Sequence, residues 1–381
     1  MYMKAVIAID SFKGSLTSLQ AGRAVAAGIE RVFPHALSVV CPIADGGEGT
    51  VDALTEGMGG EFHFVEVIGP LGEKVTAKYG IIETQKTAVM EMSQAAGITL
   101  LQKSQLNPMK TTTYGVGEMI LDAVNKGCRN FIIGIGGSAT NDGGIGMLEA
   151  LGFGILDDNG NPVPFGAEGV EKAQSIDDKN VPAVLKECVF NIACDVNNPL
   201  CGEEGCSAVF APQKGADEEM VARMDQALSR FAQIVKEKYP ESDMNYPGAG
   251  AAGGLGFAFL SFLGGKLTRG IDLVIKETNL ENHVKDADIV ITGEGRLDSQ
   301  SVHGKAPIGV SNVAKKYGKT VIAFSGCVTR DATVCNRHGI DAYFPIVRGA
   351  CTLEEAMDPK VASQNLTDTV EQVFNLIKRK F

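Results

Sequence analysis

The sequence predicts an α/β protein in which one parallel-sheet domain is interrupted by a second, inserted α/β domain. At both ends of the chain, apolar runs of strand length alternate with segments of helical spacing, which favours parallel sheets with crossover helices. In the middle, strand-like runs follow one another closely. The 381 residues also exceed one ordinary domain of about 100–200 residues. We therefore expect residues 1–60 and 280–381 to form one domain, residues 61–279 to form the inserted domain, and the active site to lie in the cleft between them.

The N-terminal segment has a strand–helix–strand pattern. The apolar run Ala5–Asp10 predicts a buried strand. The spacing within Leu16–Val32 predicts a helix, with Thr17 or Ser18 as its N-cap. A second strand is expected at Ser38–Ala44, so the segment would begin a parallel sheet.

The middle of the chain is mixed in character. Between Phe62 and Met92 the pattern predicts close-spaced strands with a hairpin at Gly69–Glu73. Strands and helices then follow one another without a regular period. The expected helices are Thr113–Asn125 and Met220–Lys238, and the expected strands are Asn130–Ile135, Val189–Val196 and Ala208–Phe210.

The C-terminal segment returns to the regular alternation of the N-terminal one, which suggests that both belong to one domain. The expected strands are Asp288–Thr292, Thr320–Ser325 and Ala342–Val347. The expected helices are Pro307–Tyr317, a short helix before the last strand, and Leu353–Lys380.

Composition and charge exclude several classes of protein. Apolar residues make up 44% and charged residues 21% of the chain, which excludes disordered and coiled-coil proteins. The net charge is −11 without a stripe of Lys or Arg, so we expect no nucleic-acid or membrane partner. Residues 244–265 are uncharged but contain seven glycines, so we expect a glycine-rich loop and a short buried helix there. Nine irregularly spaced cysteines and no signal-peptide pattern favour reduced thiols in the cytoplasm.

Glycine and acidic residues gather where the predicted strands end. Ligands of α/β proteins bind at the carboxyl ends of the strands, so these clusters are candidate sites. Each cluster also has a structural interpretation, as a helix cap, a tight packing loop or a surface ion pair. The five clusters are Asp10–Ser18, Asp45–Thr50, Gly134–Gly144, Ala193–Leu200 and Thr292–Lys305.

The residue types in these clusters point to phosphoryl transfer. Carboxylates in glycine-rich turns suit Mg²⁺, glycine loops present N–H groups to phosphate or carboxylate oxygens, and lysines offset phosphate charge. Asp195 follows a strand directly and could take a proton from a substrate hydroxyl. His303 is a lesser catalytic candidate. The start of Gly134–Gly144 also fits the loose dinucleotide pattern G-x-G-x-x-A, which leaves a nicotinamide dehydrogenase as an alternative.

Six motifs follow one another along the chain. They are DSFKGSLTS from Asp10, PIADGGEGT from Pro42, GGSATNDGG from Gly136, CDVNNPLCG from Cys194, PQKGA from Pro212 and TGEGRLDSQSVHGK from Thr292. In this order they resemble the bacterial glycerate kinase family of the first type. The resemblance implies a flavodoxin-like domain interrupted by an inserted α/β domain, and phosphorylation of D-glycerate with ATP and Mg²⁺, generally to 2-phosphoglycerate. We expect a cytoplasmic monomer or homodimer whose small-molecule partners are D-glycerate and ATP.

The resemblance marks these motifs as one cleft, in which we assign roles residue by residue. The expected catalytic residues are Asp195, as the base for the acceptor hydroxyl, Lys13 and Lys305. The expected substrate-binding residues are Asp10, Ser11, Lys13, Ser138, Thr140 and Asn141. The expected nucleotide-binding residues are Gly46, Gly47, Lys214, Gly293, Glu294, Gly295 and Lys305. The expected Mg²⁺ ligands are Asp45, Glu294 and, behind them, Asp298.

Two further interpretations stay open. A glycerate 3-kinase, or a kinase of another small hydroxy acid, would share every motif and differ only in its pocket. A metabolite-binding protein without catalysis could use the same glycine loops. The carboxylates at Asp10, Asp45, Asp195 and Glu294 favour an enzyme over such a binding protein.

Overall fold

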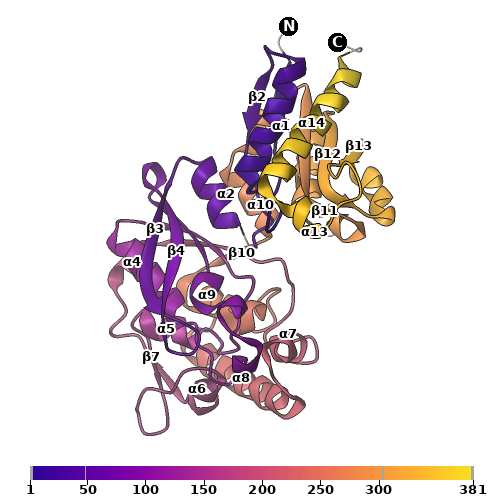
Figure 1. Ribbon diagram of the computed structural model, residues 1–381. Helices are drawn as coiled ribbons and strands as arrows, with labels where there is room; N and C mark the ends of the chain where they lie inside the picture. The colour runs from indigo at the N-terminus through magenta and orange to yellow at the C-terminus, as the bar shows by residue number, and fades with distance from the viewer. Residues whose placement is uncertain (1–2, 48, 303, 379–381) are drawn as a thin grey trace. The chain divides into compact units, whose positions relative to one another are not determined.

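Two compact units make up the computed structural model, which describes residues 3–47, 49–302 and 304–378 (Figure 1). Unit 1 comprises residues 3–45, 49–60 and 270–378, and unit 2 comprises residues 46–47 and 61–269. Unit 2 is therefore inserted, in sequence, into unit 1. The candidate His303 lies outside the described residues.

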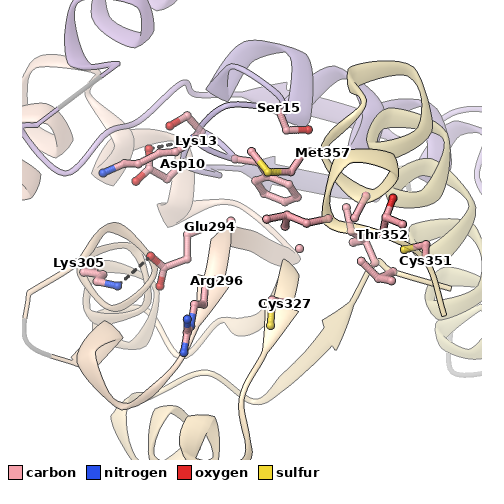
Figure 2. A pocket seen from close by; sticks show the side chains of 18 of the residues that line it. Asp10, Lys13, Ser15, Glu294, Arg296, Lys305, Cys327, Cys351, Thr352 and Met357 are labelled. Carbon is pink, nitrogen blue, oxygen red and sulfur yellow. Dashed lines mark hydrogen bonds and ion pairs between the residues drawn. The ribbon is translucent and has the colours of Figure 1, made fainter. Parts of the chain in front are cut away.

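Unit 1 is built on a five-stranded parallel sheet. Its strands are β1 (Lys4–Ile7), β2 (Leu37–Val40), β11 (Ile289–Leu297), β12 (Thr320–Val328) and β13 (Ala342–Pro345). They are ordered β13-β12-β11-β1-β2, and every neighbouring pair is parallel. Counted along this unit, the order is 2-1-3-4-5, which is that of flavodoxin, so the predicted flavodoxin-like fold is confirmed. The winding reverses between β1 and β11, and a pocket lies at the carboxyl ends of these strands (Figure 2), as the rule for such sheets requires.

Two groups of helices in unit 1 pack on its sheet. The helices of this unit are α1 (Ser18–Val32), α2 (Thr50–Gly57), α10 (Gly270–Glu277), α11 (Leu280–Lys285), α12 (Ala306–Lys316), α13 (Leu353–Met357) and α14 (Pro359–Ile377). Helices α1 and α14 lie side by side (Figure 1) and enclose an apolar core with the sheet. Helices α10, α11 and α12 pack together, with α12 against β11 and β12.

The start of α1 fixes the ends of the first two strands. The Thr17 side chain accepts a hydrogen bond from the Gln20 N–H at 3.2 Å, and the Thr17 N–H donates to the Gln20 side chain at 2.9 Å. Thr17 is therefore the N-cap. The Ser18 hydroxyl donates to the Ile9 carbonyl at 2.6 Å and accepts from the Ile43 N–H at 2.9 Å. Ser18 thus joins the chain that leaves β1 to the chain that leaves β2.

The predicted single helix Leu353–Lys380 is wrong, because the chain breaks it into α13 and α14. Pro359 disfavours helical backbone at the residue before it, and Asp358 has ψ of 124°. The Asp358 carboxylate instead caps α14 by accepting from the Lys360 and Val361 N–H groups, both at 3.0 Å. The break leaves α13 as a separate short helix beside the pocket of unit 1.

Unit 2 contains a six-stranded mixed sheet and a two-stranded one. The strands are β3 (Glu61–Ile68), β4 (Lys74–Ile82), β5 (Thr87–Glu91), β6 (Asn130–Gly134), β7 (Gly154–Leu156), β8 (Ser175–Asp177), β9 (Val189–Ala193) and β10 (Lys266–Thr268). The large sheet has the order β10-β9-β6-β5-β4-β3; β3, β4 and β5 are antiparallel neighbours, and β5, β6, β9 and β10 are parallel neighbours. The predicted hairpin joins β3 to β4.

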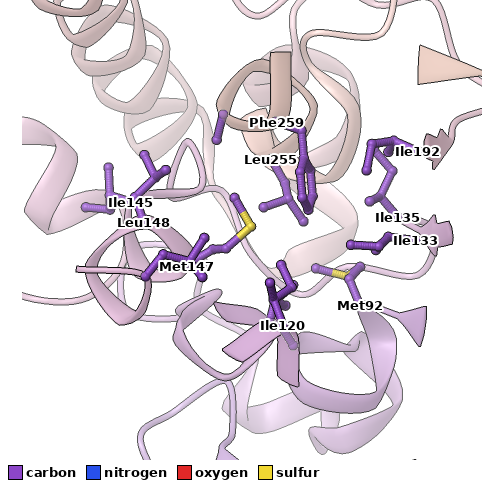
Figure 3. Close-up of a cluster of buried hydrophobic side chains, with 14 of the residues drawn as sticks. Met92, Ile120, Ile133, Ile135, Ile145, Met147, Leu148, Ile192, Leu255 and Phe259 are labelled. Atoms are coloured by element: carbon purple, nitrogen blue, oxygen red, sulfur yellow. The ribbon is translucent and has the colours of Figure 1, made fainter. Parts of the chain in front are cut away.

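The helices of unit 2 bury one large apolar cluster. They are α3 (Ser93–Ala96), α4 (Tyr114–Asn125), α5 (Ile145–Ala150), α6 (Ala167–Lys172), α7 (Cys206–Phe210), α8 (Glu218–Lys238) and α9 (Ala251–Leu263). Figure 3 shows Ile133 and Ile192, from β6 and β9, meeting Leu255 and Phe259 of α9. This core holds the loops that follow β6 and β9, which carry predicted site residues.

The predicted strand Ala208–Phe210 is wrong, since these residues belong to α7. A short apolar run does not distinguish a strand from a buried helical turn. Cys206 and Ser207 at the start of α7 are fully buried, and the Ser207 hydroxyl accepts from the Asn141 side chain at 2.9 Å. Tertiary packing therefore determines that these residues are helical.

Residues 244–265 form a glycine-rich loop and the buried helix α9, as predicted. The backbone at Gly253 and Gly254 is left-handed. A Cβ atom at Gly253 would lie 2.2 Å from the Thr140 carbonyl, and one at Gly254 would lie 2.7 Å from Gly143. Glycine thus lets α9 approach the loop after β6. No helix in the described part of the chain is long and apolar enough to cross a membrane.

Candidate active site

The pocket of unit 1 is a cavity of about 660 Å³ where β1 and β11 end, within the usual size of small-molecule sites. One end is charged and the other apolar (Figure 2). Its polar and charged lining residues include Asp10, Ser11, Lys13, Asp45, Glu294, Arg296 and Lys305. The sequence clusters Asp10–Ser18, Asp45–Thr50 and Thr292–Lys305 are therefore brought together.

Carboxylates converge at the charged end. Asp10 is 3% exposed and accepts a hydrogen bond from the Ser11 N–H at 2.6 Å. Burial and the neighbouring Asp45 carboxylate raise the pKa of Asp10 to about 8, and Glu294 contributes in the same direction. Burial also raises the pKa of Glu294. Crowded carboxylates of this kind would be relieved by a bound cation.

Lysines partly balance these carboxylates. Lys13 lies 3.5 Å from Asp45, and Lys305 lies 3.6 Å from Glu294 and 3.9 Å from Asp298 (Figure 2 shows the Lys305–Glu294 pair). Asp298 also pairs with Arg296 at 3.2 Å but does not line the cavity. Asp298 therefore forms ion pairs with the side chains of Arg296 and Lys305 rather than facing the pocket. Among the residues that the structure describes, no three His, Cys, Asp or Glu side chains are grouped closely enough to hold a metal by themselves.

The apolar end comes from segments that the motifs did not single out. Its residues include Phe12, Cys327, Ile346, Val347, Leu353, Ala356 and Met357. Cys327 lies at the carboxyl end of β12, Ile346 and Val347 follow β13, and the last three residues belong to α13. The rule that ligands bind at strand ends could have identified the residues near the ends of β12 and β13. The residues of α13 could be identified only once the break at Pro359 was known.

The pocket of unit 2 is smaller, with a cavity of about 310 Å³. It lies where β6 and β9 end, so it joins the clusters Gly134–Gly144 and Ala193–Leu200. Its lining residues include Gly46, Gly47, Gly136, Gly137, Ser138, Asp195, Gln213 and Lys214. Asp195 is an exposed residue two positions beyond the end of β9.

Lys214 is the only lysine among the residues lining this pocket, and it is buried to 2% exposure. Its ammonium donates to the Ser138 hydroxyl at 2.8 Å and to the Thr140 carbonyl at 2.6 Å. Burial lowers the pKa of Lys214 to about 8. Two of the three ammonium hydrogens are thus directed to the loop after β6, and the side chain places positive charge beneath that loop.

The predicted site residues are therefore divided between two pockets. Asp10, Ser11, Lys13, Asp45, Glu294, Gly295 and Lys305 line the pocket of unit 1, and Gly46, Gly47, Ser138, Asp195 and Lys214 line the pocket of unit 2. Thr140, Asn141, Gly293 and Asp298 line neither. Thr140 and Asn141 are fully buried, and the Thr140 hydroxyl has no hydrogen-bond partner among the described residues. Each predicted set, for substrate and for nucleotide, contains members of both pockets.

Comparison with known proteins gives one consistent result. A model of the Glycerate kinase family matches residues 5–378. The chain is 49% identical over 354 residues to the glycerate 2-kinase of Escherichia coli (strain K12), covering 93% of each protein. It is 47% identical to a glycerate kinase of Haemophilus influenzae, covering 100% of each. A crystal structure from Salmonella typhimurium LT2, provisionally assigned as glycerate kinase 2, superposes with a TM-score of 0.93 at 46% identity, covering 100% of this chain and 99% of that one.

Proposed function

Because the chain belongs to the glycerate kinase family, and is thus a phosphotransferase, we propose that it transfers the γ-phosphoryl group of ATP to the C2 hydroxyl of D-glycerate. The products are 2-phospho-D-glycerate and ADP. The observation that carries this proposal is the pocket of unit 1, where Lys13 and Lys305 accompany Asp10, Asp45 and Glu294 at the ends of parallel strands. Cations and metal-binding carboxylates together are what phosphoryl transfer requires.

We assign the acceptor chemistry to the pocket of unit 2. Lys214 and the Ser138 hydroxyl that it contacts supply charge and a hydrogen-bond donor for the glycerate carboxylate. Asp195 accepts the proton of the C2 hydroxyl as that oxygen bonds to the γ-phosphorus. The bond from the γ-phosphorus to the bridging oxygen breaks, and ADP leaves with the electron pair. Lys13 and Lys305 offset the charge of the transferring group.

The carboxylates of unit 1 fit a Mg²⁺ ion. Mg²⁺ in proteins usually takes one or two carboxylates and completes its shell with phosphate oxygens and water, so a three-carboxylate cage is not needed. Asp45 and Glu294 would hold it, and the crowding that raises the pKa of Asp10 favours a cation beside that residue. When bound, the ion would neutralise phosphate charge. Asp298, paired with Arg296 and Lys305, would keep these cations in position.

The position of phosphate in the product tests this proposal. After incubation with Mg-ATP and D-glycerate, we expect NMR to detect phosphate on C2. Phosphate on C3 would contradict the regiochemistry but retain a glycerate kinase. If glycerate is not phosphorylated by the folded protein while tartronate or lactate is, the acceptor assignment is wrong. If none is phosphorylated, the proposal fails and a binding protein without catalysis becomes the better interpretation.

A pH profile tests the role of Lys214. Because burial lowers its pKa to about 8, the ammonium loses its proton as pH rises through that value. With ATP saturating, we expect kcat/KM for glycerate to fall above about pH 8, by roughly tenfold per pH unit, since kcat/KM reports ionisations of the enzyme before the varied substrate binds. We expect the Lys214→Met variant to lack this alkaline decline and to start from a lower value at neutral pH. If the decline in kcat/KM persists unchanged in Lys214→Met, the ionisation of another group causes it.

A further inference from the structure

We propose that the apolar end of the pocket of unit 1, formed by α13, the carboxyl end of β12 and the loop after β13, binds the base of the nucleotide. This inference deepens the proposed function and rests on ATP being the phosphoryl donor. It adds a subsite to a pocket whose charged end is already assigned to phosphates.

The first support is the pattern of α13. Leu353, Ala356 and Met357 have the i, i+3, i+4 spacing that places three side chains on one face of a helix. All three line the cavity, and no residue of α13 is buried. Leu353 is 76% exposed. An apolar helix face normally packs on the core, whereas this one borders an open pocket.

The second support is how α13 is held. Thr352 and Glu355 form a capping box, with the Thr352 N–H donating to the Glu355 side chain at 2.9 Å and the Glu355 N–H donating to the Thr352 hydroxyl at 3.2 Å. The Met357 methyl group lies 2.7 Å from where a Cβ atom at Gly14 would be. The helix is therefore fixed at its start and touches the loop between β1 and α1.

The third support is that the charged and apolar ends of the cavity match the two parts of a nucleotide. Figure 2 shows Lys13, Glu294 and Lys305 at one side of the cavity and Met357, Cys327 and Cys351 toward the other. A nucleotide joins a charged polyphosphate to a flat base with apolar faces. Glycerate has no apolar surface of that extent, so it would leave the α13 face exposed to water. Burying such a face on a flat ring is favourable.

The test separates base binding from phosphate binding. We choose Ala356→Trp, which fills the apolar end, and Glu354→Trp, which adds the same bulk to α13 at a residue that does not line the cavity. Affinities for ADP and for inorganic tripolyphosphate are measured by calorimetry. For Ala356→Trp we expect ADP affinity to fall tenfold or more and tripolyphosphate affinity to stay within twofold of the unmodified protein. For Glu354→Trp we expect both affinities to be unchanged.

Several outcomes would overturn the inference. Unchanged ADP affinity in Ala356→Trp would show that the base lies elsewhere, and a higher KM for glycerate alone would assign the apolar end to the acceptor. If Ala356→Trp does not fold, Leu353→Gln serves instead, because that side chain is largely exposed; its ADP affinity should fall several-fold and its tripolyphosphate affinity should not. Failure of the proposed function is distinguishable, since the unmodified protein would then not phosphorylate glycerate whatever its ADP affinity.

Discussion

Replacement of Asp195 by Asn is expected to lower kcat for glycerate phosphorylation by about 10²–10⁴-fold, the usual contribution of a general base. The amide cannot accept the hydroxyl proton, yet it has nearly the shape of the carboxylate. The KM for glycerate should therefore change by only a few-fold, because Lys214 and Ser138, the groups proposed to bind the carboxylate, remain in place. Steady-state kinetics at saturating Mg-ATP measure both values.

Glu203→Gln is the matched control for this experiment. It also converts a carboxylate to an amide, but at an exposed residue that lines neither pocket, so its kcat should equal that of the unmodified enzyme. Wild-type turnover in Asp195→Asn, with normal glycerate binding, would mean that Asp195 is not the base.

The second large effect concerns folding and is expected for Gly293→Ala. Gly293 lies within β11 opposite Phe324 of β12, and a Cβ atom there would lie 1.9 Å from the Phe324 carbonyl oxygen. The strands would have to separate at the centre of the sheet. We expect the free energy of unfolding to fall by about 2–4 kcal/mol, measured by chemical denaturation.

Gly295→Ala provides the comparison within the same motif. Its Cβ atom would meet nothing closer than Phe12 Cα at 3.4 Å, so the stability should change by less than about 1 kcal/mol. Gly295 lines the pocket and Gly293 does not, so only Gly295→Ala should change the KM for ATP in a stable protein. Equal stability losses in the two variants would contradict the assigned roles.

The fold of unit 1 could be predicted because its signals are local. Alternating apolar runs and helical spacing identify β1, α1, β11, α12 and β12, and a parallel sheet follows from that alternation. The break before α14 also had a local signal, the dipeptide Asp358-Pro359, which the periodicity of the surrounding residues concealed. The α7 helix had no such signal, since packing of Cys206 and Ser207 against the loop after β6 decides it.

The candidate site was predictable as a set of residues but not as an arrangement. Strand-end clusters identified Asp10, Glu294 and Asp195, yet nothing local shows which clusters share a pocket, because that depends on the strand order. Glycines of a single motif can also have different roles, one in strand packing and another in ligand binding. Gly293 and Gly295 are two residues apart. What distinguishes them is the space for a Cβ atom, which would lie 1.9 Å from the Phe324 carbonyl oxygen at Gly293 but no closer than 3.4 Å to another atom at Gly295.

The adjacency of β1 and β11 also bears on how the chain reaches its native state. The Lys4 N–H donates to the Asp288 carboxylate across 284 residues of sequence, and the two strands pair in register. During synthesis, β1 and its neighbour β2 emerge long before β11, the other neighbour of β1, exists, and the whole of unit 2 is made in between. Contacts of such long range form late and slowly. Until β11 is made, the edge of β1 that faces β11 in the native sheet has no strand to pair with, and an unpaired strand edge is a site at which chains can aggregate.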